Sequence, residues 1–445
     1  MSKIETGVER ALVPFANFVD HQASNSIVLL ICTITALGLA NSPWAAQYFA
    51  ALATELGVRL GEQELALSIR LWVSDGLMAV FFYLLGSELK REFLAGQFAD
   101  WRQALPVVVA AAGGMLVPAS LYLLFTFEYA ELRSGWGIPL ATDAAFAIGL
   151  LALLGSRIPT AVITLVTALA IIDDLGAIIV IAVFYTETLD VQYLLYAAGL
   201  VGLLVLANLG GARTPWVYFP VGVLLWYCIH HSGVHATIAG VLVAACVPAR
   251  AKKDPDWLLR RLPRLLRVFE RKTTSDEAAT LADGAPQEVA DEVVASVRQA
   301  TTPLRRWEHK LENVVFLIIM PLFALANAGI AVQARDLLAL IDNPMSLGIA
   351  AGLLVGKVTG IAGSFWLLLR AGVARLPEGT HFAHVVGVGL LSGVGFTMSI
   401  FIAGLTFDTG SEVHTDALAS VLVTSLLAAI AGLAWLRFAC PEPAT

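Results

Sequence analysis

The chain has 445 residues, of which 58% are hydrophobic and only 14% are charged. Soluble globular proteins have about 25% charged and about 45–50% apolar residues. With a mean hydropathy of +0.77, this composition excludes an ordinary soluble domain and predicts a polytopic membrane protein. The net charge of −7 is modest and no basic block occurs, so we expect no nucleic-acid partner.

Twelve apolar segments have the length of a transmembrane helix, roughly 17–25 residues, or are shorter where a helix is broken. In chain order they cover residues 26–41, 71–89, 105–127, 136–154, 159–184, 193–209, 216–229, 235–247, 313–330, 347–369, 385–405 and 417–438. The sequence therefore predicts an all-α membrane protein with about twelve transmembrane helices.

The distribution of lysine and arginine predicts the orientation. If the N-terminus is cytoplasmic, most of the 28 basic residues fall in loops on that side, and only Arg59, Arg70, Arg133 and Arg335 fall in outer loops. This bias follows the positive-inside rule and places both termini in the cytoplasm.

Residues 1–25 lack the features of a signal peptide, so no cleaved leader is expected. The four scattered cysteines fit neither a disulfide framework nor a zinc site, and no cofactor is expected.

Two stretches outside the apolar segments have a recognisable pattern. Residues 57–65 alternate about Gly61 and Glu62, which predicts a short external β-hairpin, with an irregular loop as the alternative. An exposed hairpin edge is able to pair with a second copy.

In the long hydrophilic segment 251–303, residues 257–271 predict a basic amphipathic helix suited to the inner membrane surface. Residues 275–290 are acidic and predict a flexible connector, with a regulatory role as the alternative.

The feature with the most unfavourable free energy in a membrane is the adjacent pair Asp173 and Asp174 in the apolar run 163–184. A carboxylate at bilayer depth is unfavourable unless it is paired, solvated or coordinating an ion, and intramembrane acids mark functional sites. Two adjacent carboxylates also repel each other. We therefore expect the rest of the chain to supply partners for this pair.

Three further features accompany the pair. Pro139 and Asp143 lie in the fourth segment, where proline frees backbone carbonyls at membrane depth. A glycine cluster at 387–395 predicts a second broken helix in the eleventh segment, and Lys357 lies alone in the tenth. Each has a structural alternative: a kink, close helix packing, or a lysine that reaches the interface. Broken helices in the middle of two triplets, segments 3–5 and 10–12, nevertheless favour an inverted-topology repeat with a midplane site.

The chemistry of such a site follows from its atoms. Adjacent helical residues point about 100° apart, so one carboxylate is able to face a cavity while the other faces Lys357. Carboxylate and carbonyl oxygens suit a small hard cation. A proton and a cation bound to the same carboxylates exclude each other. If both loaded forms switch sides of the membrane, the result is antiport.

Other functions remain as alternatives. An intramembrane aspartyl protease also uses two aspartates, but on two helices that face one water, which adjacent residues of one helix cannot do. A channel or an organic-anion symporter is a further alternative, and paired carboxylates disfavour anions.

Eight blocks occur in order from the second segment to the eleventh: DGLMAVFF at 75–82, GSELKRE at 86–92, ATDAAFA at 141–147, IIDDLG at 171–176, GVHATIAG at 233–240, PLFALANAG at 321–329, GK at 356–357 and GVGFTMS at 393–399. Together they strongly resemble the NhaA-type bacterial sodium/proton antiporters. The resemblance implies a bacterial inner-membrane protein with two crossing, broken helices. It implies exchange of cytoplasmic Na⁺ or Li⁺ for more than one external proton, with higher activity at alkaline pH.

The resemblance also implies an organisation. Residues 104–186 and 346–438 would form the transporting core, and residues 24–100, 192–248 and 308–332 an interface domain. Residues 249–305 would form a cytoplasmic loop. A homodimer would assemble through the hairpin near 57–65, in contact with membrane lipid.

Site residues are carried over by motif. Asp174 would be the main Na⁺ ligand, and Asp173 its partner, which bonds Lys357 in one state and releases it in another. Thr142 and Asp143 would belong to the crossing of the broken helices. A cytoplasmic pH-response cluster would comprise Glu88, Lys90, Arg91, Glu92, Glu308 and His309, together with His235, for which packing or hydrogen bonding is the alternative.

Two departures affect the pH response. Familiar members have another histidine where this chain has Glu312, and their connector is shorter than 251–303. The activation pH is therefore expected to differ, with a protein that barely responds to pH as the alternative.

Overall fold

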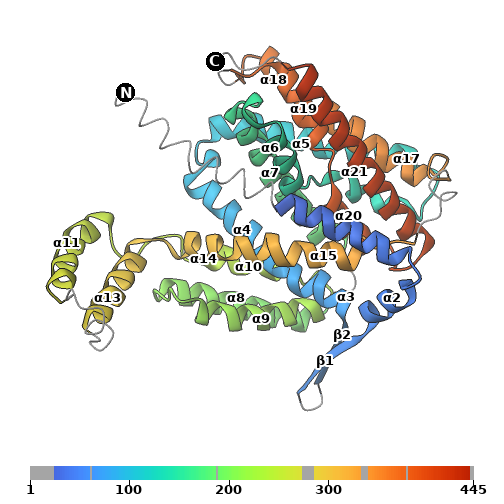
Figure 1. Ribbon diagram of the computed structural model, residues 1–445. Coiled ribbons are helices and arrows are strands. Elements are labelled where there is room, and N and C mark those ends of the chain that lie inside the picture. The colour runs from blue at the N-terminus through green and yellow to red at the C-terminus, as the bar shows by residue number, and fades with distance from the viewer. Residues whose placement is uncertain are drawn as a thin grey trace. The chain divides into compact units, whose positions relative to one another are not determined.

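The protein is described by a computed structural model covering residues 25–60, 63–186, 189–272, 285–331, 339–376 and 379–440 (Figure 1). Within these residues, eight helices are long and apolar enough to cross a membrane: Ile69–Ala95, Ala104–Phe125, Arg133–Leu153, Thr160–Phe184, Val191–Leu209, Pro303–Asn327, Pro344–Arg370 and Glu412–Phe438. Two bent pairs, Asn25–Ala40 with Ala45–Ala53 and Phe382–Leu391 with Phe396–Thr406, raise the number to ten. The prediction of a multi-pass helical membrane protein is confirmed.

Every one of the twelve predicted segments contains a helix. The two that fall outside the eight helices and two bent pairs are α9 (Pro215–His231) and α10 (Ile238–Cys246), which have 17 and 9 residues. Residues 1–24, where no cleaved leader is expected, and the hairpin turn at 61–62 lie outside the described residues.

After Asn25–Ala40, the regular elements are α2 Ala45–Ala53, β1 Glu55–Leu60, β2 Gln63–Ser68, α3 Ile69–Leu71, η1 Trp72–Leu77, α4 Met78–Ala95, η2 Gln97–Ala99, α5 Trp101–Phe125, η3 Arg133–Leu140, α6 Ala144–Leu153, η4 Gly155–Arg157, α7 Thr160–Phe184, α8 Val191–Leu209, α9, α10, α11 Pro255–Lys272, α13 Ala285–Ala300, α14 Pro303–Val314, η5 Val315–Ile319, α15 Met320–Asn327, α17 Pro344–Ala350, η6 Ala351–Gly356, α18 Lys357–Arg370, α19 Phe382–Leu391, α20 Phe396–Thr406 and α21 Glu412–Phe438. Three of them, η1, η5 and η6, are π-helical turns inside longer helices, a form that is frequent at functional sites.

The predicted β-hairpin is confirmed. β1 and β2 pair antiparallel, from Glu55 opposite Ser68 to Leu60 opposite Gln63. Trp72 Nε1 donates a hydrogen bond of 2.8 Å to Leu56 O, which ties the hairpin to the start of the following helix.

The connector 251–303 differs in part from the expectation. The predicted basic amphipathic helix is present as α11. Residues 285–290, expected to be flexible, instead begin helix α13, where Val289 is buried. Residues 275–284 lie outside the described part of the chain.

The chain divides into two compact units: Met1–Phe81, Glu92–Thr188 and Val314–Thr445 form the first, and Phe82–Arg91 and Leu189–Asn313 form the second. The second unit holds α8, α9, α10, α11 and α13, together with most of α14. The division into a transporting core and an interface domain, which follows other boundaries, stays a prediction.

The first unit contains an apolar core between α5, α6, α7, α18, α19 and α21, with fully buried residues such as Ala110, Ala111, Leu169, Ile361 and Val388. Helices α5 and α18 approach closely through glycines, since a Cβ on Gly360 would lie 2.2 Å from Gly113 O. Small residues allow this packing where lipid provides no hydrophobic driving force. The close approach positions Lys357, the first residue of α18, beside the two broken helices.

Both predicted broken helices are present in the first unit. In the fourth segment, Pro139 lies inside the 3₁₀ helix η3, and the break is the extended stretch 141–143 between η3 and α6. The break therefore begins two residues later than the proline that predicted it. In the eleventh segment, residues 392–395 separate α19 from α20, within the predicted glycine cluster, and the two halves are bent by 44°.

Candidate functional site

Hydrogen bonds join the two breaks directly. Asp143 N donates to Val394 O at 2.7 Å, and Ser399 Oγ donates to Ile138 O at 2.7 Å. The break between α19 and α20 also requires glycine where it passes η6, because a Cβ on Gly393 would lie 2.4 Å from Leu353 O. Extended backbone at membrane depth leaves polar groups outside a helical ladder, and each break supplies partners for the other.

Asp173 lies on α7 and is fully buried. Its Oδ2 accepts hydrogen bonds from Lys357 Nζ at 2.6 Å and from Thr142 Oγ1 at 2.7 Å. Lys357 is also fully buried, and Nζ donates a second bond of 2.5 Å to Leu140 O, the last residue of η3. The structure thus brings together three of the predicted residues, which are far apart in the sequence.

The ammonium of Lys357 serves two partners. The carbonyl of Leu140 belongs to the C-terminal end of a half-helix, which carries partial negative charge. Asp173 supplies the full negative charge that a buried lysine needs. The preceding turn, η6, brings Lys357 close to both partners because its glycines allow tight packing. A Cβ on Gly352 would lie 2.7 Å from Pro139, and a Cβ on Gly356 would lie 2.7 Å from Pro118.

Thr142 is placed where it has two acceptors. Its hydroxyl lies 2.7 Å from Asp173 Oδ2 and 2.9 Å from Ser392 O. A hydroxyl carries one hydrogen, so Thr142 donates to only one of them at a time. It therefore connects the acidic pair on α7 to the break between α19 and α20.

Asp143 is 2% exposed and caps two helices at once. Its Oδ1 accepts from Phe146 N of α6 at 3.1 Å, and its Oδ2 accepts from Thr397 N and Thr397 Oγ1 of α20 at 3.2 and 2.5 Å. Both helices point their positive N-terminal ends at this carboxylate. Asp143 therefore lies at the predicted crossing, where its contacts are those of a helix cap.

Asp174 is also buried, at 5% exposure, on the turn of α7 that carries Asp173. Its side chain points about 100° away from that of Asp173 around the helix axis. The two carboxylates therefore face different surroundings, and Asp173 is the one that meets Lys357.

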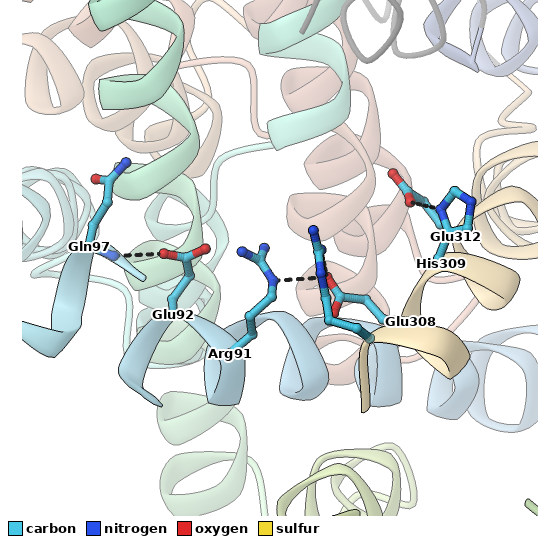
Figure 2. A network of polar contacts seen from close by, with 7 residues as sticks. Arg91, Glu92, Gln97, Glu308, His309 and Glu312 are labelled. Carbon is cyan, nitrogen blue, oxygen red and sulfur yellow. Dashed lines mark hydrogen bonds and ion pairs between the residues drawn. The ribbon is translucent and has the colours of Figure 1, made fainter. Parts of the chain in front are cut away.

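The predicted pH-response residues are distributed over several contacts. In the second unit, Arg91 Nε pairs with the buried Glu308 at 3.0 Å, and Arg305 Nη1 pairs with the same oxygen at 3.2 Å (Figure 2). Lys90 Nζ donates to Ala245 O at 2.6 Å and Val247 O at 2.5 Å, at the C-terminal end of α10.

The remaining predicted residues make local contacts or are partly exposed. Glu92 accepts a bond of 3.0 Å from Gln97 N at the end of its own helix, α4. His309 is exposed and lies 3.7 Å from Glu312, the residue that replaces the expected histidine. Glu88 and His235 are half-buried.

Sequence reasoning missed the roles of Thr397, Ser399 and the carbonyls of Leu140 and Ser392. Only Thr397 has a local signal, because a threonine two residues after a glycine cluster is typical of a helix N-terminus. The carbonyls have none, because their availability depends on where each helix breaks.

The Na⁺/H⁺ antiporter 1 family model matches residues 16–436. The Na⁺/H⁺ antiporter NhaA 1 of Saccharophagus degradans is 43% identical over 98% of this chain and 94% of the relative. That of Shewanella denitrificans is 41% identical over 98% and 96%, and the NhaA of Oleidesulfovibrio alaskensis is 43% identical over 97% and 95%. The chain belongs to the Na⁺/H⁺ antiporter 1 family.

Membership in the Na⁺/H⁺ antiporter 1 family confirms the resemblance drawn from the eight sequence blocks. The matched region contains both broken helices, eleven of the helical segments in full and all but the last two residues of the twelfth. The relatives are named as antiporters rather than as enzymes. The chain is therefore a multi-pass membrane transporter, and the aspartyl protease alternative is rejected.

Proposed function

We propose that this protein exchanges Na⁺, and also Li⁺, for protons across a bacterial inner membrane by alternating access. The observation that carries the proposal is the buried group of Asp173, Lys357 and Thr142 beside two bonded helix breaks. Charged groups at this depth are expensive to maintain without a function. Family membership identifies that function as sodium/proton exchange.

In this proposal the cation is held by Asp174 and Asp173. Carboxylate oxygens suit Na⁺ and Li⁺. Because the ammonium of Lys357 occupies Asp173 Oδ2, a cation bound to that oxygen must displace it. Competition between the cation and the protons of the site couples the two fluxes. Asp173, Asp174 and Lys357 are all candidate proton carriers.

The regulation and assembly of the exchanger belong to the same proposal. Segments 104–186 and 346–438 act as the transporting core beside an interface domain, and both termini are cytoplasmic. The hairpin β1–β2 joins two copies into a dimer. The ion pairs of Arg91, Glu308 and Arg305, with Lys90 on the end of α10, support a role for this region in the response to pH.

The test is exchange in inverted membrane vesicles, measured as dissipation of a pH gradient on addition of Na⁺, Li⁺ or K⁺. We expect Na⁺ and Li⁺ to dissipate the gradient, and Asp174→Asn to abolish this because the amide removes the negative charge. Asp291→Asn, on the exposed face of α13, is the matched control and should retain exchange. Normal exchange by Asp174→Asn would refute the site.

A further inference from the structure

The connector between α10 and α14 folds into a pair of antiparallel helices, α11 and α13, which we call the connector hairpin (residues 255–272 and 285–300; Figure 1). Arg261 on α11 forms an ion pair with Glu292 on α13 and donates from Nε to Ser296 Oγ at 3.2 Å. Leu265 and Val289 are buried between the helices. The connector hairpin therefore has an inner face with its own packing and polar contacts.

The outer face of α11 carries a row of arginines. Arg260, Arg264, Arg267 and Arg271 are spaced i, i+4, i+7 and i+11, so they lie within about 60° of arc around the helix. All four are exposed. Among the described residues none forms a salt bridge with them, although Arg267 Nε donates to Pro263 O at 3.2 Å. Within this part of the chain the row forms no ion pair and outnumbers the two exposed acids of α11, Asp256 and Glu270, so this face of the helix carries a net positive charge.

Two exposed leucines lie on one side of this row. Leu259 is 68% exposed and Leu266 is 53% exposed, and their i, i+7 spacing places them on one side of α11. Single exposed leucines are common in proteins. A row of arginines beside exposed leucines on one amphipathic helix is instead typical of a helix that lies in a membrane interface.

The connector hairpin is held close to the membrane-crossing part of its unit. Leu304 N, at the start of α14, donates to Pro248 O just after α10 at 3.3 Å, so the two ends of the connector lie side by side. Only six residues separate Pro248 from the first residue of α11, which limits their distance to at most about 25 Å. Helix α14 begins the candidate span Pro303–Asn327. A bilayer surface is thus within reach of α11.

We propose that α11 docks on the bilayer surface and binds anionic lipid headgroups. The arginine row contacts the headgroup phosphates, since guanidinium groups match phosphate geometry, and Leu259 and Leu266 insert at the boundary with the acyl chains. Charge complementarity and the short tether favour lipid over a soluble acidic partner. Helix α13 carries the acidic residues Glu288 and Asp291 on exposed positions, and the proposal places this helix on the side of α11 away from the membrane. The connector is a lipid-sensing element of the transporter.

The experiment uses the full chain in nanodiscs of phosphatidylcholine alone or of phosphatidylcholine mixed with an equal amount of phosphatidylglycerol. A spin label at Leu266→Cys, in a chain whose native cysteines are replaced by serine, reports collisions with oxygen and with a water-soluble nickel chelate. We expect protection from the chelate only in the anionic nanodiscs. Replacing the four arginines of the row by glutamine should abolish this protection, because each arginine raises the affinity for the anionic bilayer roughly five-fold. High salt should weaken the protection.

Controls keep the outcome interpretable. Replacing the same four arginines by lysine keeps the charge and should keep the protection, which separates loss of docking from misfolding. Glutamine at Lys252, Lys253 and Arg298, off the row, should change nothing. A label at Ala295→Cys, on the exposed side of α13, should stay accessible throughout. A Leu266 label that is equally accessible in both lipids, equally protected in both, or protected in detergent through self-association would overturn the proposal.

Discussion

Lys357 forms a buried ion pair with a residue of another helix, so its contribution to the stability of the protein can be measured by mutation. It is fully buried, and its charge is balanced by Asp173 at 2.6 Å. A buried ion pair is often no better than two well-packed apolar residues, but removing one partner leaves an uncompensated charge and costs about 3–5 kcal/mol. The Asp173–Lys357 pair should therefore show strong coupling between its two members.

We predict that Lys357→Ala lowers the stability of the purified protein by about 3–5 kcal/mol, because the Asp173 carboxylate is left without its counter-charge. The double variant Asp173→Asn/Lys357→Ala should recover much of this loss. The measurement is a double-mutant cycle of thermal unfolding in detergent, with exchange followed over a range of pH. Additive losses would show that the pair is not coupled, and an unchanged pH profile of exchange in Lys357→Ala would remove Lys357 from the mechanism.

The two half-helices α6 and α20 share one cap. An ordinary N-cap side chain satisfies donors of a single helix, as Asp190 does for Gln192 N and Tyr193 N of α8. Asp143 accepts from donors of two helices and is buried between them. The crossing of the broken helices thus depends on one carboxylate that stabilises both elements.

We predict that Asp143→Ala destabilises the protein by about 2–4 kcal/mol, because Phe146 N and the two donors of Thr397 lose their acceptor. Asp143→Asn keeps an acceptor oxygen, so its free energy of unfolding should fall by less than half as much as that of Asp143→Ala. Asp190→Ala, which uncaps one exposed helix, is the matched control and should lose about 1 kcal/mol. Thermal unfolding of the purified variants measures all three, and equal losses for Asp143→Ala and Asp190→Ala would contradict the shared cap.

The sequence predicts those features that are encoded within one short stretch of the chain. The helices follow from segment length and hydropathy, and the hairpin follows from alternation about Gly61 and Glu62. The need for a partner to Asp173 follows from the cost of an intramembrane charge. Each of these properties is contained in a short stretch of chain.

Features that depend on two distant stretches were not predictable from residue patterns alone. Lys357 and Asp173 are 184 residues apart; helix geometry indicates only that one carboxylate of the pair is able to face Lys357, and the resemblance to a family assigns that contact to Asp173. The break after η3 begins at residue 141 and not at Pro139, because the backbone there bonds to the other broken helix at Val394. The π-helical turn η6 has an ordinary helical composition, so its position shows only in the folded chain.

For the whole molecule, the described residues contain one sheet, the hairpin β1–β2. A two-stranded hairpin alone is marginally stable in water and leaves both outer edges unpaired. Its last paired residues lie directly before α3 and the membrane span Ile69–Ala95. Pairing with the hairpin of a second copy would satisfy an edge and fix two transporters side by side.

We predict that the full chain is a dimer, and that removing residues 58–65 and joining Gly57 to Ala66 through Asn-Gly makes it a monomer. The outer strand edges are then too short to pair, whereas the buried group around Asp173 is unaffected and Na⁺/H⁺ exchange should persist. Native mass spectrometry of the detergent-solubilised protein measures the oligomeric state, and vesicle exchange measures activity. The matched control replaces the connector residues 251–301 with a short glycine-serine linker, which the adjacent ends at Pro248 and Leu304 permit, and it should stay dimeric. A shortened hairpin that still gives dimers would place the interface elsewhere on the molecule.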